Sequence, residues 1–380
     1  MTRTINPFFL DLTGEEIEEV QREFGEILRR GELILGRHTD SFEKEFAAYV
    51  GTKFAAAVST GTSALEILLA LKGAAGKRIA VPSNTNFASV AAIIRAGGTP
   101  VFMDMTPDYF VPNFDMFREV AERHRIGGAM WVHIGGIIPP DFVRVVEHCA
   151  KQGIFLIEDA AHAHGSGVAG VKAGNLADGA AFSFFPTKVM TTMEGGMVTT
   201  NNESDWKLVK SLRNQGKRDG NYGGLHYDMG SSLRISEIAA YIGRVQLRKL
   251  DRMVAVRANA ARQIADCLKA LSIEWCDTSH MDQASQYKFI IRLPDGVETG
   301  AVKLALSQRG VICGGGVYDV PCHLQPVFSN VEADRPKLRN TETWCPRHIC
   351  PPITSGTTEE DIVALSAALR EVLAVRHAPV

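Results

Sequence analysis

The stretch Ile154-Phe-Leu-Ile-Glu-Asp159-Ala-Ala-His162 decides the fold class, because an uninterrupted apolar run ends there in a carboxylate. Five other short runs are mostly apolar without alternation, and stretches with helical spacing separate them: Ile79–Pro82, Val101–Met105, Ala129–Ile134, Ala180–Phe185 and Met197–Thr199. Continuous apolar strands are typical of a sheet covered by helices on both faces. Repeated strand–helix alternation therefore predicts an α/β architecture with a mostly parallel central sheet flanked by helices.

Three helices are expected before the first of these strands. Thr13-Gly-Glu-Glu16 forms a capping box, and the helix that it opens is expected to stop at Gly31. Its apolar stripe consists of Ile17, Val20, Phe24, Ile27 and Leu28. A second helix is predicted from Asp40 to Gly51, and a third begins near Thr62.

The texture of the chain changes after about residue 250. A helix is predicted over Ile235–Leu250, and its continuation through Met253–Leu271 leads into this region. Strands are predicted there at Tyr287–Leu293 and Val311–Cys313. A helix is predicted at Ala301–Gln308, and Thr357–Glu360 cap a last helix. A chain of 380 residues suggests about two or three folding units. We predict a large α/β domain over residues 1–250 and a small C-terminal α+β domain over residues 251–380.

Composition excludes several classes of protein. Lys plus Arg number 41 and Asp plus Glu number 43, so no basic excess indicates nucleic-acid binding. The sequence contains no run of about 18 uncharged apolar residues, so no membrane span is predicted. Asp11 and Glu15 interrupt the amino terminus too early for a secretory leader. The seven scattered cysteines predict a reducing, cytoplasmic location, and Cys345-Pro-Arg-His348-Ile-Cys350 indicates packing rather than a metal site.

Two polar features each suit either an ordinary helix cap or an anionic ligand. Ser59-Thr60-Gly61-Thr62 precedes a helix, where free N–H groups bind anions, although an ordinary turn with an N-cap has the same pattern. Gly230-Ser-Ser232-Leu-Arg234 precedes another helix, and it suits either a cap or an anionic ligand.

Two further features supply a carboxylate and an amine. Asp159 ends a strand, so it is either a helix cap or a partly desolvated acid that needs a cationic partner. Lys188 follows the aromatic strand that contains Ser183, and burial there would lower its pKa and make the amine nucleophilic.

Together the four features suit pyridoxal 5'-phosphate. Lys188 would hold the cofactor as a Schiff base, and Asp159 would keep the ring nitrogen protonated so that the ring accepts electrons. Ser183 is placed to turn its hydroxyl toward the phosphate.

The chain resembles the DegT/DnrJ/StrS-type sugar aminotransferases, which have the pyridoxal-phosphate fold type I of aspartate aminotransferase. The motifs that carry the resemblance are STGTSAL (59–65), EDAAHAHGS (158–166), SFFPTKVMTTMEGG (183–196), RISEIAAYIGRVQLRKLD (234–251) and CHLQPVF (322–328). The resemblance implies Lys188 as the Schiff-base lysine, Asp159 as the pyridinium partner and phosphate contacts from Gly61, Thr62 and Ser183. It also implies a homodimer in which the loop 230–234 reaches the neighbouring subunit's site.

Several residues depart from the family pattern. His162 replaces a frequent Gln and is still able to hydrogen-bond the ring oxygen, whereas Asn86 stands where an aromatic residue usually covers the ring. Either Asn86 packs on the ring or the neighbouring Phe87 substitutes for it. Ser232 replaces an Asn that contacts the phosphate across the dimer. Met193 takes the place of a Gly.

The activity implied is transfer of an amino group from a donor, by resemblance L-glutamate, to a keto sugar that is often nucleotide-linked. Pyridoxamine 5'-phosphate is the intermediate form of the cofactor. Tyr318 and His323 are candidates for the substrate pocket, with a structural role for His323 the stronger interpretation. Two alternatives stay open: an aminotransferase for a cyclitol or other non-sugar ketone, and a cofactor-binding regulator without turnover. A dehydratase branch is disfavoured, because it has His in place of the lysine.

Overall fold

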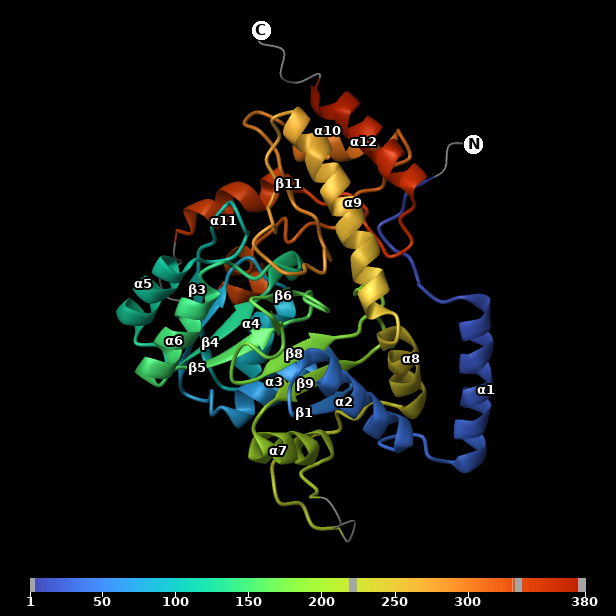
Figure 1. The fold of residues 1–380 in the computed structure, drawn as a ribbon. Coiled ribbons are helices and arrows are strands. Elements are labelled where there is room, and N and C mark those ends of the chain that lie inside the picture. Colours follow the sequence, from blue (N-terminus) through green and yellow to red (C-terminus); the bar gives the residue numbers. More distant parts are fainter. Residues whose placement is uncertain (1–3, 219–223, 330, 332–336, 375–380) are drawn as a thin grey trace.

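The computed structural model describes residues 4–218, 224–329, 331 and 337–374. Its centre is a seven-stranded sheet with the order β1-β9-β8-β5-β4-β2-β3 (Figure 1). The strands are β1 (Phe54–Val58), β2 (Arg78–Pro82), β3 (Thr99–Met103), β4 (Gly128–Val132), β5 (Phe155–Asp159), β8 (Ala180–Ser183) and β9 (Gly196–Thr200). Strands β3, β2, β4, β5 and β8 pair in parallel, and β9 is antiparallel to both of its neighbours. The prediction of a mostly parallel sheet is confirmed.

All six predicted runs form strands, and no strand end differs from the prediction by more than two residues. Strand β1 was not predicted, because its Phe-Ala-Ala-Ala-Val sequence has few of the β-branched residues that favour strands. The strand is instead stabilised by antiparallel pairing with β9, which runs from Phe54 opposite Thr200 to Val58 opposite Gly196.

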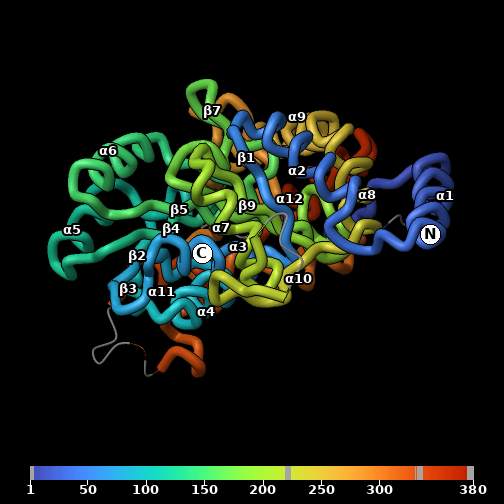
Figure 2. The backbone as a smooth tube through the Cα atoms, turned by 90° about the horizontal axis from the view of Figure 1, so that it is seen from below, coloured from blue at the N-terminus to red at the C-terminus, as the bar shows by residue number. Residues whose placement is uncertain are grey.

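Helix α1 (Gly14–Arg30) forms as predicted. The Oγ1 atom of Thr13 accepts the N–H of Glu16, and the Glu16 carboxylate accepts the N–H of Thr13. Of its apolar stripe only Ile27 is buried, whereas Ile17, Phe24 and Leu28 are 44, 44 and 55% exposed. Figure 2 shows α1 at one outer edge of the molecule, opposite α5 (Phe114–His124) and α6 (Phe142–Gln152).

Helix α2 (Arg37–Val50) begins three residues before the predicted start at Asp40. The reason is a carboxylate from a distant helix, α8 (Glu237–Leu247). Glu237 accepts the N–H groups of Gly36, His38 and Thr39 at 2.8, 2.8 and 2.9 Å. An acceptor from elsewhere in the chain thus caps the helix, and no local sequence signal marks it.

Most of the remaining helices pack on the sheet or on one another, and the C-terminal helices form a second apolar cluster. Helix α3 (Gly61–Leu71) contacts α4 (Phe87–Arg95), α7 (Glu203–Arg213) and strands β8 and β9, while α5 packs with α6 and α2 with α8. Long α9 (Leu250–Ala270) starts in the core around the sheet and ends in a second apolar cluster. That cluster also contains residues of α10 (Thr299–Ser307) and α12 (Glu359–Ala374).

The C-terminal region contains less strand than predicted. Only β10 (Ile291–Arg292) forms within Tyr287–Leu293, and it pairs with β11 (His348–Ile349). The predicted strand at Val311–Cys313 is wrong: Val311 makes a single bridge to Ile5, because no longer partner strand lies beside it. Shorter elements are β6 (Gly167–Val168), β7 (Val171–Lys172) and α11 (Arg339–Trp344). A domain boundary at residue 250 stays a prediction.

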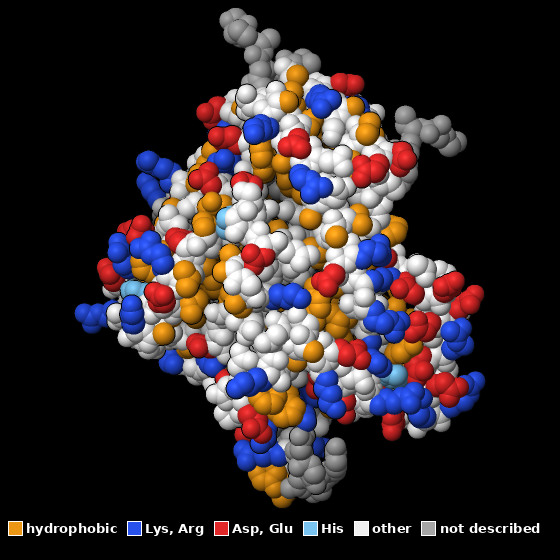
Figure 3. Space-filling model, viewed as in Figure 1, with side chains coloured by type: hydrophobic (Ala, Val, Ile, Leu, Met, Phe, Trp, Pro, Cys, Tyr) orange, Lys and Arg blue, Asp and Glu red, His pale blue; other side chains and the backbone are white. Residues whose placement is uncertain are grey.

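Several features of the described part bear on function. It contains no helix with the length and apolar character that crossing a bilayer requires, and no group of three His, Cys, Asp or Glu side chains arranged to hold a metal ion. All seven cysteines are free thiols. His348 accepts the N–H of Val317 and bonds the carbonyl of Cys345, so it is a satisfied core histidine. Figure 3 shows acidic and basic side chains intermingled over one face.

Candidate active site

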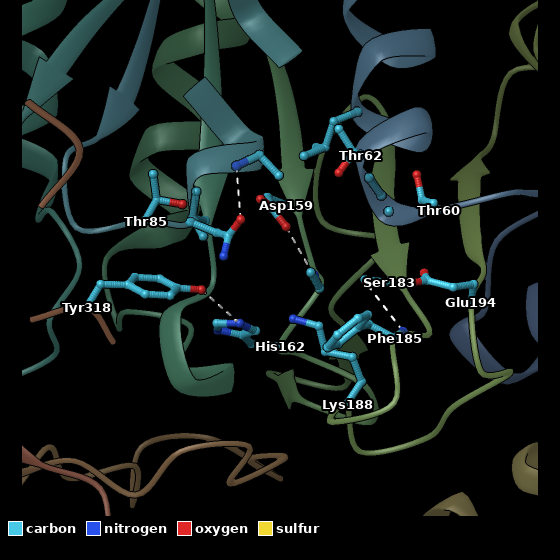
Figure 4. Close-up of a pocket in the computed structure, with 17 residues that line it drawn as sticks. Thr60, Thr62, Thr85, Asp159, His162, Ser183, Phe185, Lys188, Glu194 and Tyr318 are labelled. Carbon is cyan, nitrogen blue, oxygen red and sulfur yellow. Dashed lines mark hydrogen bonds between the residues drawn. The ribbon is translucent and has the colours of Figure 1, made fainter. Parts of the chain in front are cut away.

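A cavity of about 330 Å³ lies at the carboxyl ends of the parallel strands, where ligands bind in open α/β sheets. Seven residues predicted for cofactor binding or catalysis line it, and so does Tyr318: Gly61, Thr62, Asn86, Asp159, His162, Ser183 and Lys188. In Figure 4, Thr60 and Thr62 lie at one end of the cavity and Tyr318 at the other, with Lys188 extending toward His162.

The first wall of the cavity is the amino end of α3 against the end of β8. Gly61 and Thr62 are the first two residues of the helix, so their N–H groups have no intrahelical acceptor. The N–H of Ser63 is already satisfied by Thr60 Oγ1 at 3.0 Å. A Cβ on Gly61 would lie 2.6 Å from the Cβ of Ser183, so only glycine allows this approach. Free N–H groups, the helix dipole and the Ser183 hydroxyl together form an anion cradle.

Asp159 is buried at the tip of β5. Its carboxylate accepts the hydroxyl of Ser89 at 2.8 Å and the N–H of Ala161 at 3.2 Å. Burial raises the pKa of Asp159, against the opposing effect of these hydrogen bonds and of the Lys188 charge. A cation in the cavity would offset this burial cost, so the acid is suited to a cationic ring nitrogen.

Lys188 follows β8, and its amine reaches into the cavity. The Nζ atom lies 4.9 Å from the ring centre of Tyr287. Burial lowers the pKa of Lys188, which increases the fraction of neutral, nucleophilic amine. The Lys188 amine therefore tends toward the neutral form that imine formation requires.

His162 lies between two tyrosines. Its ring centre is 4.2 Å from that of Tyr287, and its Nε2 is 3.5 Å from the hydroxyl of Tyr318. The Nδ1 atom accepts the N–H of Gly135 at 3.3 Å. Burial, together with the charges of Lys188 and Lys288, holds the pKa of His162 well below its usual range, so the ring is neutral.

Asn86 lines the cavity but its side chain already has a local role. Its Oδ1 atom caps α4 by accepting the N–H of Ala88 at 2.9 Å. Phe87 turns away and stacks on Phe328 with ring centres 5.5 Å apart, and it does not line the cavity. Of the two residues considered for covering the ring, only Asn86 lines the cavity.

The structure does not bring every predicted residue into this cavity. Ser232 is exposed and accepts a hydrogen bond from Arg234, so within its own chain it is not part of the site. His323 is buried outside the cavity, between Ser83 at 2.6 Å and Glu342 at 3.3 Å. The contacts of His323 are those of a structural residue.

Some lining residues were not predicted. Thr60, Thr85, Phe185 and Glu194 line the cavity, and each is adjacent to or within two residues of a predicted site residue or motif. Tyr287 comes from the C-terminal region and lies 99 positions from Lys188, so no motif marks it. Met193, expected near the lysine, is 53% exposed and has a φ of 70°, a left-handed conformation that favours the Gly usual in the family.

The comparison with known proteins agrees with this geometry. The DegT/DnrJ/EryC1/StrS aminotransferase family model matches residues 14–370. The chain belongs to this family. It is therefore an aminotransferase.

Two similar proteins are named for amino sugars linked to nucleotides. GDP-perosamine synthase of Caulobacter vibrioides is 33% identical, over 89% of this chain and 91% of the relative. The dTDP-3-amino-3,4,6-trideoxy-alpha-D-glucose transaminase of Streptomyces venezuelae is 30% identical, over 96% of this chain and 95% of the relative. An aminotransferase structure from Psychrobacter cryohalolentis superposes with a TM-score of 0.89 at 26% identity, covering 98% and 100% of the two chains. The fold is that of the type I pyridoxal-phosphate aminotransferases.

Proposed function

We propose that the protein uses pyridoxal 5'-phosphate to transfer an amino group from L-glutamate to a keto sugar linked to a nucleotide. The observation that carries the proposal is one cavity in which an amine, a buried carboxylate and an anion cradle converge. Names of two relatives that act on GDP- and dTDP-linked sugars support the substrate class.

The residues present fit the cofactor. The close approach of Gly61 to Ser183 leaves a cradle that a single Cβ would fill, and its free N–H groups suit a phosphate. Burial raises the pKa of Asp159, and a protonated pyridine nitrogen beside it would favour the ionised carboxylate. When bound, the cofactor supplies an electron sink for the carbanion at the donor's Cα.

The chain's own residues would then handle protons and orientation. With the cofactor bound, the free Lys188 amine would act as the base that removes the Cα proton of the donor and as the acid that returns it. Neutral His162 and the hydroxyl of Tyr318 would fix the ring on the side away from the cradle. Asp159, held by Ser89 and Ala161, would retain the ring proton.

We also propose a homodimer in which the loop 230–234 completes the partner's site. Two observations support it: Ser232 is exposed and outside its own cavity, and α1 presents the apolar side chains Ile17, Phe24 and Leu28 to solvent. Exposed apolar stripes of this kind are typical of protein interfaces. The seven free thiols support a cytoplasmic location.

The test is an absorbance scan of the protein loaded with pyridoxal 5'-phosphate. L-glutamate should change the spectrum of the bound cofactor and yield one equivalent of 2-oxoglutarate, and a keto-sugar nucleotide should then restore the first spectrum. A spectrum that no amino donor changes would contradict the proposal and would favour a cofactor-binding regulator. Restoration by a keto cyclitol but by no sugar nucleotide would overturn the substrate class alone.

A further inference from the structure

A second cavity of about 410 Å³ adjoins the first. The two share five lining residues: Asn86, His162, Phe185, Lys188 and Tyr318. The second cavity extends from the amine of Lys188 toward the C-terminal region and the glycines 314–316. A substrate that reacts at the amine can therefore occupy it.

The wall of the second cavity is cationic. Lys188, Lys288 and Arg257 line it, and its lining contains no Asp or Glu. Among the residues that the structure describes, neither Lys288 nor Arg257 forms an ion pair with a carboxylate. The positive charge of this wall would therefore attract an anion into the cavity.

Arg257 is a buried cation with unused hydrogen-bonding capacity. It is 5% exposed, and its Nη1 atom donates to the carbonyls of Gln286 at 3.3 Å and Ile353 at 2.8 Å. Its buried Nε atom has no partner within the described residues. A buried charge without a counter-ion is costly, so an arriving anion would be stabilised here.

The amine of Lys288 lies near the same aromatic ring as the amine of Lys188. Its Nζ atom lies 5.6 Å from the ring centre of Tyr287, compared with 4.9 Å for the Nζ atom of Lys188. Its side chain also lies against the backbone of Gly314, where a Cβ would approach the amine to 3.2 Å. The glycine leaves space for the amine.

We propose that Lys288 and Arg257 form an oxyanion subsite that fixes the substrate beside Lys188, an inference that rests on the proposed function. The anion is a carboxylate of the amino donor or a phosphate of the sugar nucleotide. The place beside the reactive amine favours the donor, since an α-carboxylate is one bond from the carbon that loses its proton. Charge-assisted hydrogen bonds to Lys and a planar Arg fork suit either oxyanion.

The test compares Lys288→Met with wild type, both as holoprotein. Lys288→Arg keeps the charge, and Lys269→Met removes an exposed charge from the last turn of α9 as the matched control. Binding of glutarate, which has no amino group to react, and of inorganic phosphate is measured by calorimetry at constant ionic strength. The KM values for L-glutamate and for the sugar nucleotide are measured in parallel.

We expect Lys288→Met to weaken glutarate binding and raise the KM for glutamate by roughly 10- to 100-fold, the worth of one hydrogen bond between charged groups. Lys288→Arg should recover most of this loss, and Lys269→Met should show none. Weaker phosphate binding with a raised KM for the nucleotide alone would assign the subsite to the phosphate. Unchanged binding of both probes and unchanged KM values would overturn the subsite. Absence of turnover in wild type would refute the proposed function, while glutarate and phosphate binding would still test the subsite.

Discussion

Replacing Gly61 with Ala tests the anion cradle at its tightest point. The added methyl carbon would lie 2.6 Å from Cβ and 3.1 Å from Cα of Ser183. Carbon atoms in contact are about 3.5–4.0 Å apart, so helix α3 and strand β8 must separate by about 1 Å. Hydrogen bonds weaken steeply over such a displacement.

The magnitude follows from what the cradle would lose. One hydrogen bond to a charged group is worth about 1.5–3 kcal/mol, so the variant should bind pyridoxal 5'-phosphate roughly 10- to 100-fold more weakly. Overpacking should also destabilise the cofactor-free fold by about 1–3 kcal/mol. Titration of the cofactor-free protein with pyridoxal 5'-phosphate gives the first quantity, and denaturant unfolding without ligand gives the second.

Gly14→Ala is the matched control. Gly14 is also the first residue of a helix, α1, but no atom lies within 4 Å of the position of its added Cβ. This variant should bind the cofactor as wild type does. Cofactor affinity equal to that of wild type in Gly61→Ala would refute the cradle.

Three other predictions concern the acid, the loop and the dimer. Asp159→Asn should reduce the rate of the glutamate half-reaction roughly 100-fold or more, because an amide cannot hold a ring cation; stopped-flow absorbance at the wild-type rate would contradict this role. Met193→Gly should raise the thermal midpoint by about 1 °C in a chain of this length. A left-handed backbone costs a non-glycine residue about 1–2 kcal/mol, and the greater chain entropy of glycine in the unfolded state cancels part of that gain. Fully exposed Met229, whose φ is negative, should give no such gain when changed to Gly. Phe24→Glu on α1 should convert a dimer to a monomer in light scattering, whereas Val143→Glu, also exposed, should leave the mass unchanged.

Residues that end strands were predictable from the sequence. Asp159 closes an apolar run, Ser183 lies within an aromatic run and Lys188 follows it, so the parallel-sheet geometry alone brings them to one edge. Gly61 was predicted as a turn before a helix, a pattern that suits an anion site and an ordinary N-cap alike. The structure places all four around one cavity.

Residues that depend on tertiary packing were not predictable. Tyr287 and Arg257 reach the site from the C-terminal region, and no local pattern connects them with Lys188. Glu237 caps α2 from about 200 positions away, which is why the predicted start of that helix was late. The role of Asn86 as a helix cap also depends on where α4 begins.

The most direct test of the account is to locate the reactive amine. The holoprotein is treated with borohydride, digested and mapped by mass spectrometry for the peptide that carries the reduced cofactor. The account predicts the label on Lys188, with none on Lys288 although both amines lie against the ring of Tyr287. A label on Lys288 or on any other residue, or no label, would contradict it.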